Sequence, residues 1–256
     1  MNRYRPDVLI IGAGLAGLTA ACHAATAGAR VMVVTKGAAG EGASQWAQGG
    51  VAVPCGADDA ASHVRDTLRA GRGLCEPEAV QSIIGEGMNV AEWLRSLGMC
   101  FDAERAREGG HARARILHRE GDRTGAHIMQ VVGRALSALP STPVILEGHR
   151  VLSLCGVAET VTGVWVQSSG GEPFQINARA VILATGGLGR LYARSTNPPG
   201  ACGEGVALAF AAGAVVRDME FVQFHPTALP DGSLITEAVR GAGARLINAA
   251  GDYFMA

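Results

Sequence analysis

Three glycines within six residues form the first group that could do chemistry, in the run Gly12-Ala13-Gly14-Leu15-Ala16-Gly17. The spacing fits a dinucleotide fingerprint, in which one glycine makes a tight turn, one lets the backbone approach a pyrophosphate and one lets a helix pack on a strand. The first N–H groups of the following helix would face the phosphates. An apolar run precedes the glycines and an alanine-rich run follows them, which favours phosphate binding over a structural turn.

The residue that usually contacts the ribose is absent. An acidic residue about 20 positions after the fingerprint normally binds the ribose hydroxyl. The second apolar run ends instead in Thr35-Lys36. Lys36 could contact ribose or phosphate, although a lysine at the end of a strand is more often simply solvated.

Two further motifs combine glycine with polar side chains. One is Ser44-Gln45-Trp46-Ala47-Gln48-Gly49-Gly50, and the other is Ala184-Thr185-Gly186-Gly187. They resemble the AQGG loop and the ATGG turn of the succinate dehydrogenase and fumarate reductase flavoprotein family, in the same order and at similar distances. In such a loop a glutamine amide can hydrogen-bond the flavin edge, while glycines let backbone N–H groups approach the ring.

The resemblance implies that FAD is the cofactor and that the three motifs bind it. Lys36 and Val151 are also expected to contact FAD. Glu204, in Gly203-Glu204-Gly205, stands where the family usually has an acidic residue near the cofactor. A solvated carboxylate at the start of a helix is almost as good an interpretation.

One position bears on how the flavin is held. Respiratory members of the family carry a histidine four residues before the alanine of AQGG, and that histidine is bonded covalently to the flavin. This chain has Ala43 there. The resemblance therefore implies non-covalent FAD and argues against the respiratory enzymes.

A charged segment resembles the L-aspartate oxidase branch of the same family. Its residues Arg107-Glu108-Gly109-Gly110-His111, followed by Arg115-Ile116-Leu117-His118, are similar to the REGGH and RILH segments of that branch. Respiratory relatives have no carboxylate at the position of Glu108. A substrate with an α-ammonium group calls for a nearby anion, so Glu108 is the candidate partner. Without the resemblance, this is a charged loop on a solvated face.

The last part of the chain resembles the family's QFHPT and TEaxRG segments. In the family the histidine and threonine ligate a substrate carboxylate and the glutamate joins a polar network, which implies these roles for His225, Thr236 and Glu237. Arg240 binds substrate or only buttresses the loop.

The resemblance also implies what should follow the last residue, Ala256. The family's catalytic arginine would lie beyond Ala256, so no catalytic residue is assigned within the chain. The chain looks truncated at this end, and we expect residues 1–256 alone not to catalyse the reaction of the complete enzyme.

The resemblance implies an activity. In the complete enzyme FAD would oxidise L-aspartate to iminoaspartate by hydride transfer from Cα to flavin N5, with dioxygen or fumarate as the acceptor. The product would feed NAD synthesis by handover to a quinolinate synthase. The alternatives are a soluble fumarate reductase or succinate dehydrogenase flavoprotein, disfavoured by Ala43 and Glu108, and a non-catalytic FAD-binding fragment.

The composition argues against a protein that binds nucleic acid or a membrane. Hydrophobic residues make up 48% of the 256 residues, and the formal net charge is −1, so we expect neither a nucleic-acid partner nor an anionic membrane surface. The six cysteines form no CxxC pair, which favours reduced thiols in the cytoplasm and no metal site. No apolar run approaches the roughly 20 residues of a membrane span.

The elements that must position these residues begin with a strand at Asp7–Ile11, a helix at Leu15–Ala27 and a strand at Arg30–Thr35, which predict a parallel strand-helix-strand unit. Four alternating runs predict a small antiparallel meander, and Ala180–Ala184 predicts a core strand. Helices are expected at 60–70, 77–97, 126–138 and 206–212, and the meander runs are Val144–Glu147, Val151–Cys155, Val161–Gln167 and Phe174–Ile176.

The predicted fold class is therefore α/β. Residues 1–218 should form a Rossmann-like FAD-binding domain with an inserted antiparallel β-meander. From residue 219 the sequence changes to short strands and turns, which predicts the start of an α+β capping domain over 219–256.

Overall fold

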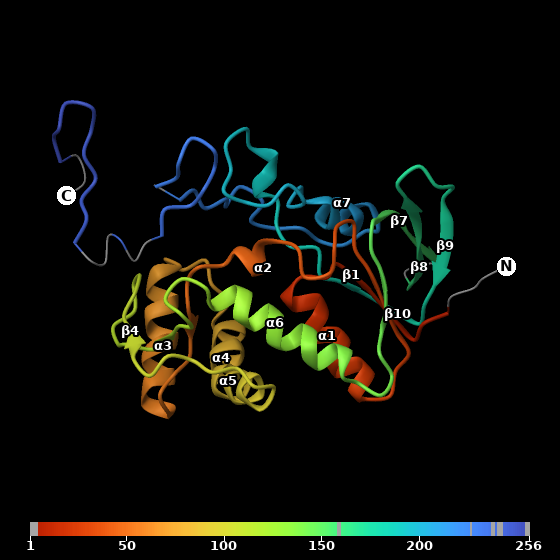
Figure 1. Ribbon diagram of the computed structural model, residues 1–256, viewed down its shortest axis with the longest axis horizontal. Helices are drawn as coiled ribbons and strands as arrows, with labels where there is room; N and C mark the ends of the chain where they lie inside the picture. Colours follow the sequence, from red (N-terminus) through yellow and green to blue (C-terminus); the bar gives the residue numbers. More distant parts are fainter. Residues whose placement is uncertain (1–4, 158–159, 226, 237–238, 240–242, 254–256) are drawn as a thin grey trace. The chain divides into compact units, whose positions relative to one another are not determined.

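The computed structural model describes residues 5–157, 160–225, 227–236, 239 and 243–253. Two compact units make up the chain (Figure 1). The first comprises residues 1–46 and 126–225, and the second comprises 47–125 and 226–256. The domain boundary expected at residue 218 stays a prediction. Among the described residues, no helix has the length and apolar character needed to cross a membrane.

A parallel four-stranded sheet is the centre of the first unit, with the strand order β10-β1-β2-β6. Strand β1 pairs with β2 on one side and with β10 on the other, both in parallel. Continuous apolar runs suit such strands, because both faces of a parallel sheet are normally covered. The strands are β1 (Val8–Ile11), β2 (Val31–Val34), β6 (Val144–Leu146) and β10 (Ala180–Leu183).

Helix α1 (Leu15–Thr26) connects β1 to β2 and confirms the predicted strand-helix-strand unit. Its small and apolar side chains Leu18, Ala21 and Cys22 are buried. Helix α6 (Thr124–Ser137) lies beside α1 in Figure 1, and the Cys22 Sγ is 3.9 Å from the Val132 carbonyl oxygen. These helices form a layer next to the sheet.

The predicted meander is present, with three strands. They are β7 (His149–Val157), β8 (Thr160–Ser168) and β9 (Phe174–Asn177), paired antiparallel in the order β7-β8-β9. The inward side chains of the meander pack on those of β1 and β2 in one core cluster. Full burial of a valine or isoleucine side chain contributes about 1.5–3 kcal/mol. The cluster consists of Leu9, Ile11, Met32, Val34, Val151, Val164, Val166 and Ile176.

The first of the four runs predicted for the meander was wrongly placed. Residues Val144–Leu146 form β6, which pairs in parallel with β2 at the edge of the central sheet. The N–H of Thr35 donates to the carbonyl oxygen of Leu146 over 2.9 Å, which extends the ladder. Since α6 precedes β6, the chain returns to the sheet from a helix, as parallel connections require.

Strand β10 is in the predicted place but is less buried than expected. Within the described residues it has β1 as its single neighbour in the sheet. Ile182 and Leu183 are 37% and 38% exposed. An apolar run predicts a strand, but it does not reveal how many neighbours the strand has. Residues of β10 line an apolar groove together with Leu154 and Ala209.

The second unit contains three helices and a small sheet. The helices are α3 (Ala57–Ala70), α4 (Pro77–Gly85) and α5 (Gly87–Ser96). The antiparallel sheet has the order β3-β5-β4, and its strands are β3 (Val51–Ala52), β4 (Arg105–Ala106) and β5 (Ile116–Leu117). Val53, Ala91 and Leu117 form its core cluster, with Val51 and Phe101 packed against it.

The single helix expected over 77–97 is in fact two helices, α4 and α5. They meet at Glu86, which has a glycine on each side. Glycine is about 1 kcal/mol less favourable than alanine inside a helix, which makes this a natural break. The predicted apolar face is consequently split, because Ile84 and Leu94 are buried while Ile83 is 75% exposed.

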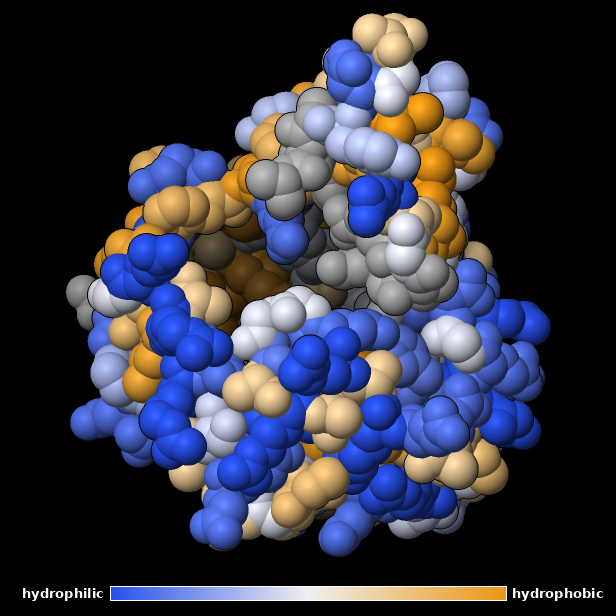
Figure 2. Space-filling model, turned by 90° about the vertical axis from the view of Figure 1, so that its left-hand side faces the viewer, coloured by the Kyte–Doolittle hydropathy of each residue, from blue (hydrophilic) through white to orange (hydrophobic). Residues whose placement is uncertain are grey.

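Figure 2 views the molecule from the left of Figure 1, and hydrophilic residues cover most of the lower half of that face. Helix α3 contributes charged residues to its own outer surface, including the 71% exposed side chain of Arg69. The described residues of the segment 227–253 include two isolated antiparallel bridges, Ala228 to Leu234 and Ile247 to Tyr253. Short strands and turns were predicted for this segment, and these bridges agree with them.

Candidate functional site

Three parallel strands of the first unit end at the same edge of the sheet. The fingerprint follows β1, Thr35 follows β2, and the ATGG turn follows β10. The Gly12 N–H donates to the Val34 carbonyl oxygen over 2.8 Å, and the Ala184 N–H donates to the Ile11 carbonyl oxygen over 2.8 Å. Ligands of open α/β sheets bind outside the carboxyl ends of the strands, and two of the three predicted motifs meet there.

Two fingerprint glycines are required by close backbone contacts. Gly12 has a φ of +108°, and a Cβ at this position would collide with the carbonyl oxygen of Ala184. A Cβ on Gly17 would collide with the carbonyl oxygen of Gly12. The turn after β1 is thus pressed against both α1 and the ATGG turn, which leaves room only for glycine.

The N-terminus of α1 has the features of an anion site. Its N-cap is Gly14, which has no side chain to cap the helix, and the first turn contains no acidic residue. The uncapped amides and the helix dipole favour a negative charge there. Ser44 Oγ accepts a hydrogen bond of 3.2 Å from the Leu15 N–H. A dinucleotide pyrophosphate fits this donor set.

Ser44 belongs to α2 (Ala43–Trp46), which contains the first half of the AQGG motif. The hydrogen bond to Leu15 therefore places Ala43, Ser44, Gln45 and Trp46 next to the fingerprint. Trp46 is a large apolar side chain that is 55% exposed. The second half of the motif belongs to the other unit.

Lys36 and Glu204 form an ion pair at the ends of two elements. Lys36 Nζ lies 2.7 Å from Glu204 Oε2, and Arg150 Nη2 lies 2.7 Å from Glu204 Oε1. The hydrogen bond from Lys36 is the main reason that the pKa of Glu204 lies below its ordinary value. Glu204 begins α7 (Glu204–Ala211), and the preceding Gly203 N–H donates to the Gly187 carbonyl oxygen over 3.2 Å.

This arrangement bears on three cofactor predictions. Lys36 is not merely solvated, and Glu204 is not a solitary helix-start carboxylate. Their contact with a cofactor stays a prediction. The Val151 side chain is 8% exposed and packs in the core, so a cofactor contact there would come from its backbone.

In the second unit, the rest of the AQGG loop runs along β5 and the segment that follows it. The Ala47 carbonyl oxygen accepts a hydrogen bond of 3.0 Å from the Gly125 N–H. A Cβ on Gly50 would press on Leu117 and on the ring of His118. The Oε1 atom of Gln48 is buried without a hydrogen-bond partner among the described residues. Buried polar atoms are normally paired, so a bound ligand would complete the Gln48 amide.

The candidate amino-group residue, Glu108, is held by a histidine. Its Oε1 lies 2.8 Å from Nε2 of His118, and its side chain is 36% exposed. His118 is 16% exposed, so the pair has a buried side and an open side. The contact with His118 uses only one of the two carboxylate oxygens of Glu108, Oε1.

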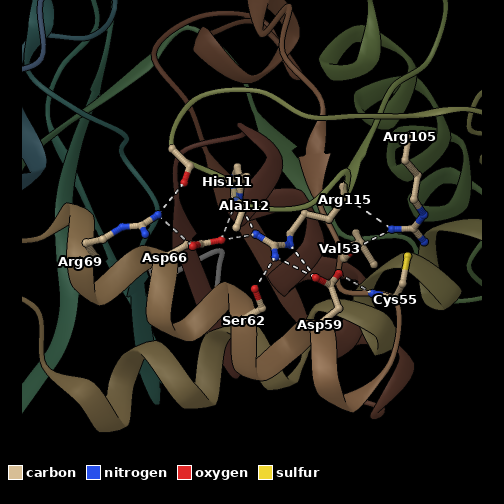
Figure 3. Close-up of polar contacts among 11 residues, drawn as sticks. Val53, Cys55, Asp59, Ser62, Asp66, Arg69, Arg105, His111, Ala112 and Arg115 are labelled. Carbon is tan, nitrogen blue, oxygen red and sulfur yellow. Dashed lines mark hydrogen bonds and ion pairs between the residues drawn. The ribbon is translucent and has the colours of Figure 1, made fainter.

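The segment that carries Glu108 is anchored by a buried arginine (Figure 3). Arg115 is fully buried, and its Nη2 lies 2.8 Å from Asp59 Oδ1 while its Nη1 lies 2.8 Å from Asp66 Oδ2. It also contacts Ser62 Oγ at 3.3 Å and His111 Nδ1 at 2.8 Å. Asp59, Ser62 and Asp66 all come from α3, so Arg115 joins β5 to that helix.

The carboxylates of this network are strongly stabilised in their charged form. The hydrogen bond from Arg115 lowers the pKa of Asp59. The backbone N–H of Ala112, together with Arg115, lowers the pKa of Asp66 to about 2. Because Ala112 follows His111 directly, both residues at the end of the REGGH segment are fixed to α3. The segment with Glu108 is therefore a held loop, and not the solvated face that its composition suggests.

The residues predicted to ligate the substrate carboxylate are divided between the units. His225 belongs to the first unit and Thr236 to the second, and both are half-buried. That they share a site with Glu108 stays a prediction. Among the described residues, no group of three or more histidine, cysteine or acidic side chains could hold a metal ion.

Three positions named in the sequence analysis lie outside the described residues. They are Glu237 and Arg240, expected near the substrate, and Ala256, the last residue of the chain. The structure therefore does not test the polar roles expected of Glu237 and Arg240. The catalytic arginine expected beyond Ala256 also stays a prediction.

Sequence reasoning missed the roles of five polar residues in these networks. Asp59 and Asp66 are seven residues apart on a helix, with Ser62 on the same face, and this spacing could have revealed a buried polar stripe. His118 was noted only as part of a similar segment. Arg150 carried no signal, since it reaches Glu204 from a strand far away in the sequence.

Comparisons with known proteins agree with this geometry. The family model described as "FAD binding domain" matches residues 7–256. The chain is 46% identical over its full length to an L-aspartate oxidase of Agrobacterium fabrum and 44% identical over 97% of its length to one of Streptomyces coelicolor. An E. coli quinol fumarate reductase structure covers 98% of this chain with a TM-score of 0.91 and 32% identity, and the chain covers 45% of that structure.

The chain spans about half the length of the curated relatives that it matches, 51% and 46% for these two. The resemblance to the flavoprotein family inferred from the motifs is confirmed, as are the expected fold class and the expected FAD cofactor.

Proposed function

Because the chain belongs to the FAD-binding domain family, we propose that it is the FAD-binding part of an enzyme that oxidises L-aspartate to iminoaspartate. The relatives named above support an L-aspartate oxidase. The observation that carries the proposal is the Glu108 carboxylate, held 2.8 Å from His118 at the end of the AQGG loop. An anion fixed beside a flavin loop suits an amino-acid substrate better than a simple dicarboxylate.

The first unit would hold the ADP moiety of FAD. The N-terminus of α1 would bind the pyrophosphate, and the ATGG turn would lie beside it. The Gln48 amide would bind the flavin edge. FAD, when bound, supplies an acceptor at N5 for the hydride that leaves the substrate Cα.

The chain's own polar residues would bind and orient the substrate. Glu108 would accept hydrogen bonds from the ammonium group, which are stronger than bonds between neutral groups because both partners are charged. His225 and Thr236 would bind a carboxylate, and Glu237 would join the surrounding polar network. Arg240 would bind substrate or buttress the loop. Holding both ends of the substrate would fix Cα against the flavin, and such orientation can supply a large part of a rate enhancement.

We further propose that FAD is bound without a covalent link, since Ala43 offers no nucleophile to the flavin. Acid precipitation of the FAD-loaded protein should then release all of the flavin into the supernatant. Flavin that stays with the precipitated chain would contradict this proposal.

Dioxygen or fumarate would reoxidise the flavin, and iminoaspartate would pass to a quinolinate synthase for NAD synthesis in the cytoplasm. All six cysteines are free thiols, which suits that compartment.

A soluble fumarate reductase or succinate dehydrogenase flavoprotein is the second candidate. The similarity to the quinol fumarate reductase structure favours it. The Glu108 carboxylate counts against it, because an anion held at the substrate site would repel a dicarboxylate that has no ammonium group.

Steady-state kinetics of Glu108→Gln test the proposed function. The host is an exchange chimera, in which this chain replaces the matching half of the Agrobacterium fabrum relative. A hydrogen bond to a charged group contributes about 1.5–3 kcal/mol, so kcat/KM for L-aspartate should fall roughly 10- to 150-fold. Turnover of fumarate or succinate should not fall, since neither carries the cation that Glu108 would bind.

The matched control is Glu172→Gln, which removes an exposed glutamate from the β8–β9 turn and should leave all turnover unchanged. Equal losses for L-aspartate, fumarate and succinate in Glu108→Gln would reduce Glu108 to a surface charge and refute the proposed role.

A further inference from the structure

His118 has a hydrogen-bond acceptor on each side of its ring. Nδ1 lies 2.8 Å from the carbonyl oxygen of Gly121, and Nε2 lies 2.8 Å from Oε1 of Glu108. A neutral imidazole carries one N–H and can donate to only one of the two. Each contact needs a proton on the ring nitrogen that makes it, because a carbonyl oxygen and a carboxylate can only accept.

The Nδ1 side of the His118 ring is held by the loop that contains Gly121, and this contact does not involve Glu108. The carboxylate of Asp102 accepts hydrogen bonds from the Glu120 N–H at 3.3 Å and the Gly121 N–H at 3.4 Å. The Asp102 N–H in turn donates to the His118 carbonyl oxygen over 2.8 Å. Because both sides of this loop are tied to Asp102, the Gly121 carbonyl is a fixed acceptor that sets the plane of the His118 ring.

On its Nε2 side the ring lies close to the AQGG loop, with little space between them. A Cβ on Gly50 would lie 3.0 Å from Nε2 of His118, and the next residue, Val51, pairs with Leu117 in the sheet. His118 therefore lies between the end of the AQGG motif and Glu108. A change in either neighbour would move the ring, and a change in the ring would move the Glu108 carboxylate.

We propose that His118 is a positioning residue that fixes Glu108 for recognition of the substrate amino group, an inference that rests on the proposed function. The Nε2–H of His118 binds one carboxylate oxygen and leaves the second, on a side chain that is 36% exposed, for the ammonium group. Two glycines follow Glu108 in the sequence, so an unanchored side chain would have to be ordered on binding. Ordering of a flexible side chain weakens binding, and His118 removes that cost beforehand.

Nitrogen NMR of the histidine rings in the FAD-loaded full chain tests the pairing without any substrate. Nε2 of His118, assigned from its absence in His118→Gln, should show the shift of a protonated nitrogen in the wild-type chain. In Glu108→Gln the proton should stay on Nδ1, which faces the Gly121 carbonyl, and Nε2 should show the shift of an unprotonated nitrogen. An unprotonated Nε2 in the wild-type chain would overturn the proposal, because Glu108 would then be the proton donor and no anion would await an ammonium group.

A double-mutant cycle in the exchange chimera tests the consequence. His118→Leu should raise KM for L-aspartate about tenfold while changing kcat less than about threefold, because the ammonium contact is present in both ground and transition states. KM for succinate should not change. In the Glu108→Gln background, His118→Leu should add nothing, since His118 acts only through Glu108.

His118→Gln, which keeps one donor, is the second variant and should show a smaller rise in KM even if His118→Leu does not fold. His149→Gln is the control, since the ring of His149 contacts the Glu147 carbonyl and Phe174 within the first unit. Additive effects of His118 and Glu108 would overturn the positioning role while leaving the proposed function intact. No preference of the wild-type chimera for L-aspartate over succinate would overturn both.

Discussion

Removal of the buried arginine is expected to be the most destabilising single change in the second unit. Arg115→Met keeps the length of the side chain and deletes the guanidinium. Asp59, whose side chain is 4% exposed, then loses the partner that binds it at 2.8 Å and 3.2 Å. Deleting one partner of a buried ion pair costs about 3–5 kcal/mol, because the remaining charge is buried without compensation.

The assay is thermal unfolding at neutral pH, followed by circular dichroism. For a chain of this size, 1 kcal/mol shifts the melting temperature by about 2–4 °C, so we expect a shift of roughly 6–20 °C. Arg69→Met is the matched control. Arg69 binds the same Asp66 at 3.1 Å, but its side chain is 71% exposed, and exposed ion pairs contribute about 0–1 kcal/mol.

A rescue variant separates the buried charge from lost packing. Replacing both Asp59 and Asp66 by asparagine in the Arg115→Met background removes the uncompensated charges and should restore part of the stability. If Arg115→Met costs no more than Arg69→Met, the network in Figure 3 does not hold α3 to β5, and the reasoning is wrong.

Three further predictions concern the remaining contacts. Gly12→Ala should lower FAD affinity at least about tenfold in a fluorescence titration, because its Cβ would displace the Ala184 carbonyl, whereas Gly85→Ala, with open space around it, should not. The folded-state pKa of Asp66, about 2, lies below its ordinary value of 3.8, so its carboxylate stabilises the fold above about pH 4, and this contribution is lost as the pH falls from about 4 to about 2. Unfolding curves of Asp66→Asn should therefore depend less on pH in that window than those of the wild-type chain. Lys36→Met should cost less than about 1 kcal/mol in urea unfolding, since the Lys36 and Glu204 side chains are 37% and 31% exposed; a larger loss would show that the pair is a structural anchor.

The first strand-helix-strand unit could be predicted because its signals are local. β1 and β2 are continuous apolar runs, and the glycines of the fingerprint mark the turn between strand and helix. The placement of β6 could not be read in the same way. Its three residues look like any short alternating strand, and their parallel pairing with β2 follows from the path of α6, which is a tertiary property.

The candidate site shows the same division. The fingerprint and the ATGG turn could be predicted to meet, since parallel strands end at one edge of the sheet. The pairing of Glu108 with His118 could not, because it depends on how the nine residues between them fold back. The ion pairing of Asp59 and Asp66 could have been predicted, since two acidic residues on the inner face of a helix need a cation as partner.

Anaerobic flavin reduction in the exchange chimera tests the central claim most directly, because it isolates the substrate half-reaction from the choice of electron acceptor. Mixed with L-aspartate, the FAD-loaded enzyme should lose the visible absorbance of its oxidised flavin at least about tenfold faster than when mixed with succinate at the same concentration. Glu108→Gln should remove most of that difference by slowing the reaction with L-aspartate. Reduction by succinate at the same rate as by L-aspartate in the unmodified chimera would contradict the claim that this chain recognises an amino dicarboxylate.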